Sequence, residues 1–287
     1  MKISVTSYSF SRLTGSGKCS EIELVKLAKD IGFDGIEFAE IHTPDGMNKK
    51  EYAAQLNEEC KRQGIECVSY TIGANFLCDD LNGEIERLKA EVDVCEALGA
   101  RLMRHDAAWG YGEDKKHTCG FENALPTLIE GCRAVTQYAA AKGIKTMTEN
   151  HGQFCQESTR VERLINGVNH PNFGALIDVG NFLCADENPA LAVGRMAPYA
   201  FHVHFKDFHF KSGNEFLPPD GFFSTRGGNY LRGAIIGHGV VPVYQCLKIL
   251  KNSGYDGYLT VEFEGMEDAV TGVTCGFNTL KKLIETV

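Results

Sequence analysis

The chain has 287 residues, and its 43% hydrophobic content is enough to build the core of one large domain. The formal net charge of −9 argues against a nucleic-acid partner, because proteins that bind DNA or RNA normally carry a basic surface. No stretch approaches the ~20 apolar residues of a membrane span, and the opening MKISVTSYSFSR lacks the apolar region of a secretory signal. The 11 cysteines form no CxxC pair, and we interpret them as reduced residues of a cytoplasmic protein.

Eight short apolar runs alternate with eight helical patterns along the chain. The runs are almost continuously apolar, which is typical of parallel strands buried on both faces, and they cover residues 3–6, 35–38, 65–70, 101–104, 144–148, 174–177, 201–205 and 258–263. The helical patterns cover residues 20–29, 49–62, 84–98, 124–141, 161–167, 189–196, 243–251 and 268–285. Ser20 and Glu23 fit a capping box, and Pro189 suits a first helical turn after Asn188. A glycine follows five of the helices, where a left-handed turn would end them.

This alternation predicts an α/β fold, a single-domain (β/α)₈ barrel over residues 1–287. An open doubly wound sheet is the alternative, but no GxGxxG follows the first strand. The repeat is interrupted once, by a polar, glycine-rich segment at about 207–241 after the seventh strand. Loops of that length inside a compact domain are usually functional, so we expect this one to lie over the active face.

Four polar residues stand at the ends of successive strands of this predicted barrel. They are Glu149, Asp178, His204 and Glu262, at or near the ends of the fifth to eighth strands. A single acidic residue after a strand is often a helix cap, but all strand ends of a barrel meet at one face, where catalysis occurs. One histidine and three carboxylates suit one divalent cation, and Mn, Mg, Co and Zn are all acceptable. The pattern therefore predicts a metal enzyme.

The chain resembles the xylose-isomerase-like TIM-barrel family of metal-dependent sugar and sugar-phosphate isomerases and epimerases. The motifs that carry the resemblance are VTSYSF, GFDGIEF, TENHG, IDVGN, HVHFKD, GHGVV and YLTVEFEG, spread over nearly the whole chain. The resemblance implies that Glu149, Asp178, His204 and Glu262 are the metal ligands and that Glu149 and Glu262 form the acid/base pair. It also implies carbohydrate metabolism and a sugar or sugar-phosphate substrate, and it allows for a homo-oligomer. Two positions depart from the family pattern: Asn181 stands where many members have a histidine, and His238 where the middle residue of GxG is usually acidic.

Further residues are candidates for contact with the substrate. His151 and Lys206 lie two residues beyond a ligand and share its facing on the strand; a loop-capping role for His151 and a structural ion pair for Lys206 are the alternatives. His105 and Glu37 come from the fourth and second strands, and the pattern buries Glu37, which then needs a partner. Arg226 and His238 belong to the long loop. His202 is expected to be a satisfied core histidine, and Trp109 follows the fourth strand, where an aromatic side chain can pack on a sugar.

The predicted reaction is proton abstraction next to a carbonyl, through an enediolate that the cation stabilises. Returning the proton to the neighbouring carbon gives isomerisation, and returning it from the opposite face gives epimerisation. A dehydratase of the inosose type, a lyase, could use the same enediolate. An endonuclease of the endonuclease IV type is disfavoured, because it needs additional histidine ligands and a surface that binds the DNA backbone.

Overall fold

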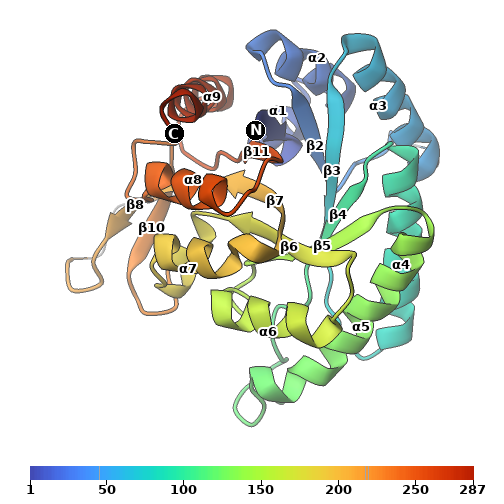
Figure 1. Cartoon of the computed structure of the whole chain (residues 1–287), viewed down its shortest axis with the longest axis vertical. Helices are drawn as coiled ribbons and strands as arrows, with labels where there is room; N and C mark the ends of the chain where they lie inside the picture. Colours follow the sequence, from blue (N-terminus) through green and yellow to red (C-terminus); the bar gives the residue numbers. More distant parts are fainter. Residues whose placement is uncertain (45, 217, 219) are drawn as a thin grey trace.

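The computed structural model describes residues 1–44, 46–216, 218 and 220–287, and in it eight parallel strands close into a barrel (Figure 1). In barrel order from β1 the strands are β1 (Lys2–Thr6), β11 (Tyr258–Val261), β7 (Ala200–Phe205), β6 (Phe173–Asp178), β5 (Lys145–Glu149), β4 (Leu102–His105), β3 (Glu66–Ile72) and β2 (Gly35–Ala39). Strand β1 closes the barrel by pairing with both β2 and β11. The predicted fold class and all eight predicted strands are confirmed.

Helices cover the outside of this barrel, as Figure 1 shows. The eight predicted helices correspond to α2 (Glu21–Ile31), α3 (Lys49–Gln63), α4 (Leu81–Ala97), α5 (Phe121–Ala141), α6 (Ser158–Val168), α7 (Pro189–Met196), α8 (Val243–Asn252) and α9 (Ala269–Thr286). The sequence pattern did not indicate the short α1 (Ser11–Gly15) or the 3₁₀ turns η1 (Ser7–Phe10), η2 (Asn181–Ala185) and η3 (Ala197–Tyr199). The Ser20–Glu23 capping box and the Asn188 cap before Pro189 are both present. Among the described residues, no helix is long and apolar enough to cross a membrane.

The hydrophobic core lies between the strands and the helix layer. Residues on both faces of the central strands are buried, because one face meets the helices and the other fills the barrel interior. The 11 cysteines all belong to the described part of the chain and are free thiols, and Cys95, Cys132 and Cys246 are buried among them. Burial raises the pKa of the Cys246 thiol to about 12, which makes that thiol inert.

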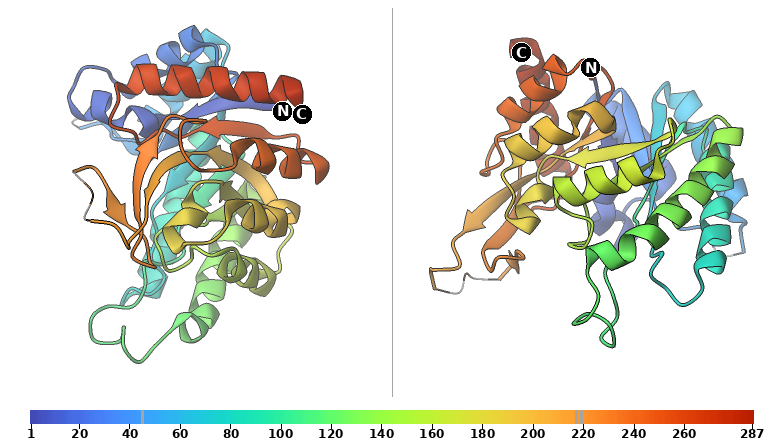
Figure 2. Two further views of the ribbon diagram at one scale, coloured as in Figure 1. Left: turned by 90° about the vertical axis from the view of Figure 1, so that its left-hand side faces the viewer. Right: turned by 60° about the horizontal axis from the view of Figure 1, so that its bottom comes forward.

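The segment predicted as a long loop contains a small antiparallel sheet. Its order is β8–β10–β9, with β8 at Asp207–Lys211, β9 at Phe223–Ser224 and β10 at Tyr230–Ala234; Leu217 and Pro219 lie outside the described residues. The strands are short and rich in glycine at their ends, which hid them from the sequence pattern. Figure 2 shows the sheet projecting from the same end of the barrel as the segment 106–120 between β4 and α5.

One carboxylate joins the two ends of this inserted sheet. Asp207 Oδ2 accepts hydrogen bonds from the N–H groups of Gly237 and Gly239, both at 2.9 Å, and Oδ1 accepts from Phe208 at 2.8 Å and Val241 at 3.0 Å. Gly237 has a φ of +90°, and a Cβ on Gly239 would lie 2.2 Å from Asp207 Oδ1, so both positions require glycine. The residue between them, His238, is exposed.

Candidate metal centre

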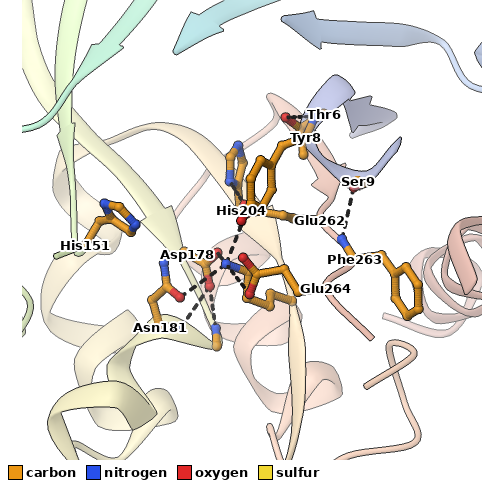
Figure 3. Close-up of polar contacts among 12 residues, drawn as sticks. Thr6, Tyr8, Ser9, His151, Asp178, Asn181, His204, Glu262, Phe263 and Glu264 are labelled. Carbon is orange, nitrogen blue, oxygen red and sulfur yellow. Dashed lines mark hydrogen bonds and ion pairs between the residues drawn. The ribbon is translucent and has the colours of Figure 1, made fainter. Parts of the chain in front are cut away.

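The barrel register brings the four predicted ligands to one place. Glu149 and Asp178 end β5 and β6, Asp178 pairs with His204 across β6 and β7, and Glu262 follows β11 directly. One ligand atom from each residue lies within 4.8 Å of the others, and all four side chains are buried. Figure 3 shows Asp178, His204 and Glu262 converging on the same point.

The charges of this cluster fit a divalent cation. Three buried carboxylates repel one another, and Asp178 Oδ2 has no hydrogen-bond partner, whereas Oδ1 accepts from the backbone of Gly180 and Asn181 at 2.8 and 2.9 Å. Burial raises the pKa of Asp178, and the carboxylates of Glu262 and Glu149 raise it further, against the opposing effect of Lys206. A cation held by these oxygens and by His204 would remove both the repulsion and the unsatisfied oxygen.

Lys206 lies next to the cluster as a buried ammonium. Its Nζ is 3.0 Å from Glu262, 3.3 Å from Glu264 and 3.6 Å from Asp178. Burial opposes the charge, but these carboxylates raise the pKa of Lys206 well above its usual value. Burial also opposes the charge of Glu262, yet Lys206 and His204 hold the pKa of that carboxyl well below its usual range. The structure therefore contains the structural ion pair that was the alternative to substrate contact for Lys206. Lys206 also lines a cavity next to the cluster.

Glu149 is held from two sides. Its Oε2 is 2.8 Å from the Arg104 guanidinium, and its Oε1 accepts a hydrogen bond of 3.0 Å from the Asn181 amide. Arg104 also contacts Asp106 at 2.7 Å, and Asp106 lies 3.1 Å from His151 Nδ1. Burial opposes protonation of His151, but the hydrogen bond to Asp106 raises its pKa. Asn181 thus orients a ligand here, at the position where many family members have a histidine.

The centre opens into a cavity with two lobes. The first lobe, of about 350 Å³, is lined by Glu149, His204 and Glu262 together with Tyr8 and Trp109. The second, of about 410 Å³, is bounded by Lys206 and Asn181 and by residues of the inserted sheet, among them Phe208 and Phe223. His151 and Glu264 belong to both lobes.

Some of the residues predicted to contact the substrate line the cavity, and others lie outside it. His151 and Lys206 line the cavity, whereas Glu37 lies beneath the centre, where it contacts His204 and His202. His105 is fully buried between Phe76 and Phe173, and its Nδ1–H donates a hydrogen bond of 2.8 Å to the Asp106 carbonyl.

Two candidates of the long loop also lie apart from the cavity. Arg226 pairs with Glu157 and donates to the Gln153 carbonyl, and His238 is exposed near the base of the inserted sheet. Neither residue, nor His105, is among those that line the two lobes. The strand-end position of His105 indicated a pocket residue, but its ring turns into the barrel wall. We leave these three out of the proposed site.

The cavity residues that the sequence analysis did not predict include three ionisable side chains close to the cluster. Tyr8 follows β1, Glu264 follows Glu262 by two residues, and Asp106 follows β4 directly. The spacing of Glu264 from Glu262 was a signal for the same facing, whereas Tyr8 lies in a turn that the pattern does not indicate. The Glu264 carboxylate and burial raise the pKa of Tyr8 to about 12, so the phenol keeps its proton.

Comparisons with known proteins agree with this architecture. An inosose dehydratase of Bacillus anthracis is 26% identical over 146 residues, which are 50% of this chain and 48% of that protein; the chain thus spans about half the length of the curated relatives it matches. The crystal structure of an IolI protein with a bound zinc atom superposes with a TM-score of 0.75 at 17% identity, covering 100% of this chain and 99% of that one. The 3-keto-D-glucoside 4-epimerase YcjR of E. coli superposes with a TM-score of 0.71 at 16% identity, covering 98% and 99%.

The match to a family model establishes the family of this chain, which the low pairwise identities do not. The model described as the xylose isomerase-like TIM barrel matches residues 25–283, which is most of the chain and includes all four candidate ligands. The predicted resemblance is confirmed: this chain belongs to the xylose isomerase-like TIM barrel family.

Proposed function

We propose that this protein is a divalent-metal-dependent isomerase or epimerase of a sugar. The observation that carries the proposal is the buried cluster of Glu149, Asp178, His204 and Glu262, whose ligand atoms lie within 4.8 Å of one another. When bound, the cation would polarise the substrate carbonyl and stabilise the negative charge of an enediolate. Glu149, Asp178, His204 and Glu262 would hold it.

Glu149 and Glu262 are the proposed acid/base pair. Both line the first lobe, and β6 and β7 separate their strands in the barrel, so the two carboxylates approach a bound substrate from different sides. One carboxylate takes the proton from the carbon next to the carbonyl and becomes protonated, and the other, which carries a proton of its own, delivers that proton to the opposite face or to the neighbouring carbon. General acid–base catalysis requires such placement near the substrate together with a suitable pKa.

The charges of the first lobe favour an unphosphorylated sugar. Five carboxylates line the lobe, namely Glu40, Asp106, Glu149, Glu262 and Glu264, and Arg104 is the one Lys or Arg among its described lining residues. Arg104 is already paired with two of those carboxylates. A phosphate in this lobe would meet more carboxylates than cationic side chains, whereas hydroxyl groups can donate hydrogen bonds to the carboxylates.

A dehydratase is the second candidate, and two observations favour it. Half of the chain is similar to inosose dehydratases, and the Lys206 ammonium lies 3.0 Å from Glu262 at the edge of the second lobe. After proton abstraction by a carboxylate, the Lys206 ammonium can transfer a proton to a hydroxyl on the next carbon, so that this hydroxyl leaves as water. The enediolate then expels water instead of taking the proton back.

One experiment separates these reactions. The metal-loaded protein is incubated in deuterated water with ketoses, aldoses and inososes. Deuterium in a substrate or product carbon without loss of water supports isomerisation or epimerisation, and loss of water supports the dehydratase. Both proposals require proton abstraction, so exchange that persists unchanged in Glu149→Gln and in Glu262→Gln would contradict the assigned acid/base pair.

Trp109 offers a direct measurement of sugar binding. It is the only tryptophan of the chain, it is 55% exposed, and its ring lies 5.1 Å from that of His151 at the cavity mouth. We expect its fluorescence to change on binding of a neutral sugar and to change little with the corresponding sugar phosphate at equal concentration. Tighter binding of the phosphate would contradict the charge argument. Tyr244→Phe changes an exposed aromatic residue outside the cavity and serves as the control, because it should leave the fluorescence change on sugar binding the same as in the wild type.

A further inference from the structure

A chain of buried polar groups runs through the barrel beneath the metal centre. Glu37, on β2, is fully buried; its Oε1 lies 2.9 Å from His204 Nε2 and its Oε2 lies 3.3 Å from His202 Nε2. His202 Nε2 is also 2.7 Å from the Thr260 hydroxyl, which is 2.7 Å from the Ser4 hydroxyl. The chain thus crosses four neighbouring strands, β2, β1, β11 and β7.

His204 connects this chain to the centre because its two ring nitrogens face opposite ways. Nδ1 lies 2.6 Å from Glu262 Oε2, on the side of the candidate ligands, and Nε2 faces Glu37. An imidazole can bind a cation only through a nitrogen that carries no proton. The position of the proton on His204 therefore decides whether the ring can serve as a ligand.

We propose that Glu37 is a positioning residue that fixes His204 in the tautomer with the proton on Nε2. The carboxylate accepts that proton in a hydrogen bond, which leaves the lone pair of Nδ1 directed at the cation and holds the ring in place. A carboxylate behind a histidine ligand also increases the basicity of the ring. The inference rests on the proposed metal binding for its effect on affinity, but the placement of the proton can be measured without a metal.

The alternative role for the same residues is to bind a second metal ion. Glu37, His202 and His204 also offer ligand atoms within 4.8 Å of one another. Two observations favour the positioning role: Glu37 Oε1 and His204 Nε2 lie 2.9 Å apart, which is the length of an N–H···O bond although the ring N–H is not aligned with the oxygen, and the Thr260 hydroxyl already occupies His202 Nε2. Three ligands would also leave a buried cation one short of the usual four.

The variants separate positioning from packing. Glu37→Gln keeps an acceptor oxygen at nearly the same volume, so we expect it to keep the tautomer and to retain most of the metal affinity. Glu37→Leu removes the acceptor, and we expect Zn²⁺ to bind about 10- to 100-fold more weakly. Thr260→Val removes the hydroxyl that contacts His202 and Ser4 and leaves the Glu37–His204 contact in place, so its Zn²⁺ affinity should match the wild type.

Two measurements on the full-length protein test the proposal. Calorimetric titration with Zn²⁺ gives affinity and stoichiometry, and long-range ¹H–¹⁵N spectra of the histidine rings show whether His204 carries a hydrogen-bonded Nε2 proton. A wild-type affinity together with an unchanged Nε2 proton in Glu37→Leu would overturn the proposal. If Glu37→Leu does not fold, an unchanged Nε2 proton signal and unchanged affinity in Glu37→Gln support it, and loss of that proton in Glu37→Gln contradicts it.

The outcomes also separate this proposal from the proposed function. Two Zn²⁺ ions per wild-type chain, with one lost in Glu37→Gln, would overturn the positioning role in favour of a second site. A wild-type protein that binds no metal would remove the proposed function. In that case the Nε2 proton of His204, present in the metal-free wild type and absent in Glu37→Leu, would still support the role of Glu37.

Discussion

At the scale of single residues, two of the four candidate ligands, Asp178 and His204, have one atom in contact with a neighbouring group outside the cluster and one atom that faces the centre. Asp178 shows this division most clearly, because Oδ1 accepts two backbone N–H groups while Oδ2 is buried without a partner. His204 divides its nitrogens between Glu37 and the centre in the same way. The protein therefore orients these two ligands by contacts that a metal ion does not have to replace.

This division predicts the behaviour of Asp178→Asn. The amide oxygen can take over the two backbone hydrogen bonds of Oδ1, while the amide nitrogen replaces the oxygen that faces the centre. We expect the variant to fold and to bind Mn²⁺ or Zn²⁺ at least about 100-fold more weakly, measured by calorimetry. Asp186→Asn makes the same chemical change at a carboxylate that contacts Thr225 and Asn229 outside the cluster, and its metal affinity should be unchanged. Stoichiometric, tight binding by Asp178→Asn would remove Asp178 from the ligand set.

The sequence pattern predicted the clustering of the four candidate ligands better than the contacts around them. Glu149 and Asp178 end apolar runs, and the geometry of a parallel barrel alone is enough to place such ends together. The contact of Arg104 with Glu149 and that of Glu37 with His204 depend instead on side-chain direction and on register across several strands, which spacing along the chain does not contain. His105 was predicted to contact the substrate but does not line the cavity, because a strand-end position does not determine on which side of the barrel wall the ring packs.

At the scale of elements, the inserted sheet contributes one side of the second lobe and is attached to the barrel by Asp207. This carboxylate accepts four backbone N–H groups from both ends of the insertion. The pattern of the sequence indicated the length and position of the insertion. The sheet itself was missed because strands of two to five residues with glycines between them show too little alternation to be distinguished from a loop.

We expect Asp207→Asn to loosen the insertion while the barrel stays folded. The amide nitrogen would face N–H donors, so two of the four hydrogen bonds are lost, at a cost of about 3 kcal/mol in the local opening free energy. Hydrogen exchange of the Gly237, Gly239 and Val241 amides should therefore accelerate by about two orders of magnitude. Asp220→Asn, an exposed carboxylate in the same insertion, is the control. Equal exchange rates in the two variants would show that the four hydrogen bonds of Asp207 are not needed to hold the insertion in place.

At the scale of the whole molecule, the barrel buries a polar interior as well as an apolar core, and this links its stability to pH. His105 is completely buried, and burial lowers its pKa from near 6.5 to about 4. Between these two values the unfolded chain binds a proton at this residue that the folded chain does not. The contribution of His105 is therefore fully present above pH 6.5 and is lost as the pH falls toward 4.

The expected loss from His105 is about 3 kcal/mol over that interval. It can be isolated with His105→Phe, which keeps an aromatic ring between Phe76 and Phe173 and removes the titration. Urea unfolding at pH 7, 6, 5 and 4.5 should show a steeper fall in the free energy of unfolding for the wild type than for the variant. His170→Phe, at a histidine outside the buried core, should leave the wild-type pH dependence unchanged. Parallel curves for the wild type and His105→Phe would contradict a buried, neutral His105.

The four hydrogen bonds of Asp207 have a consequence for how this protein can change over evolutionary time. Because one side chain closes both ends of the insertion, the residues between β8 and β10 can be lengthened, shortened or exchanged without altering the register of the barrel or the four ligands. Phe223 and Gly221, which line the second lobe, lie within that exchangeable stretch. The residues that contact the substrate can therefore diverge by replacement of this insertion, while the four candidate ligands at the strand ends stay the same.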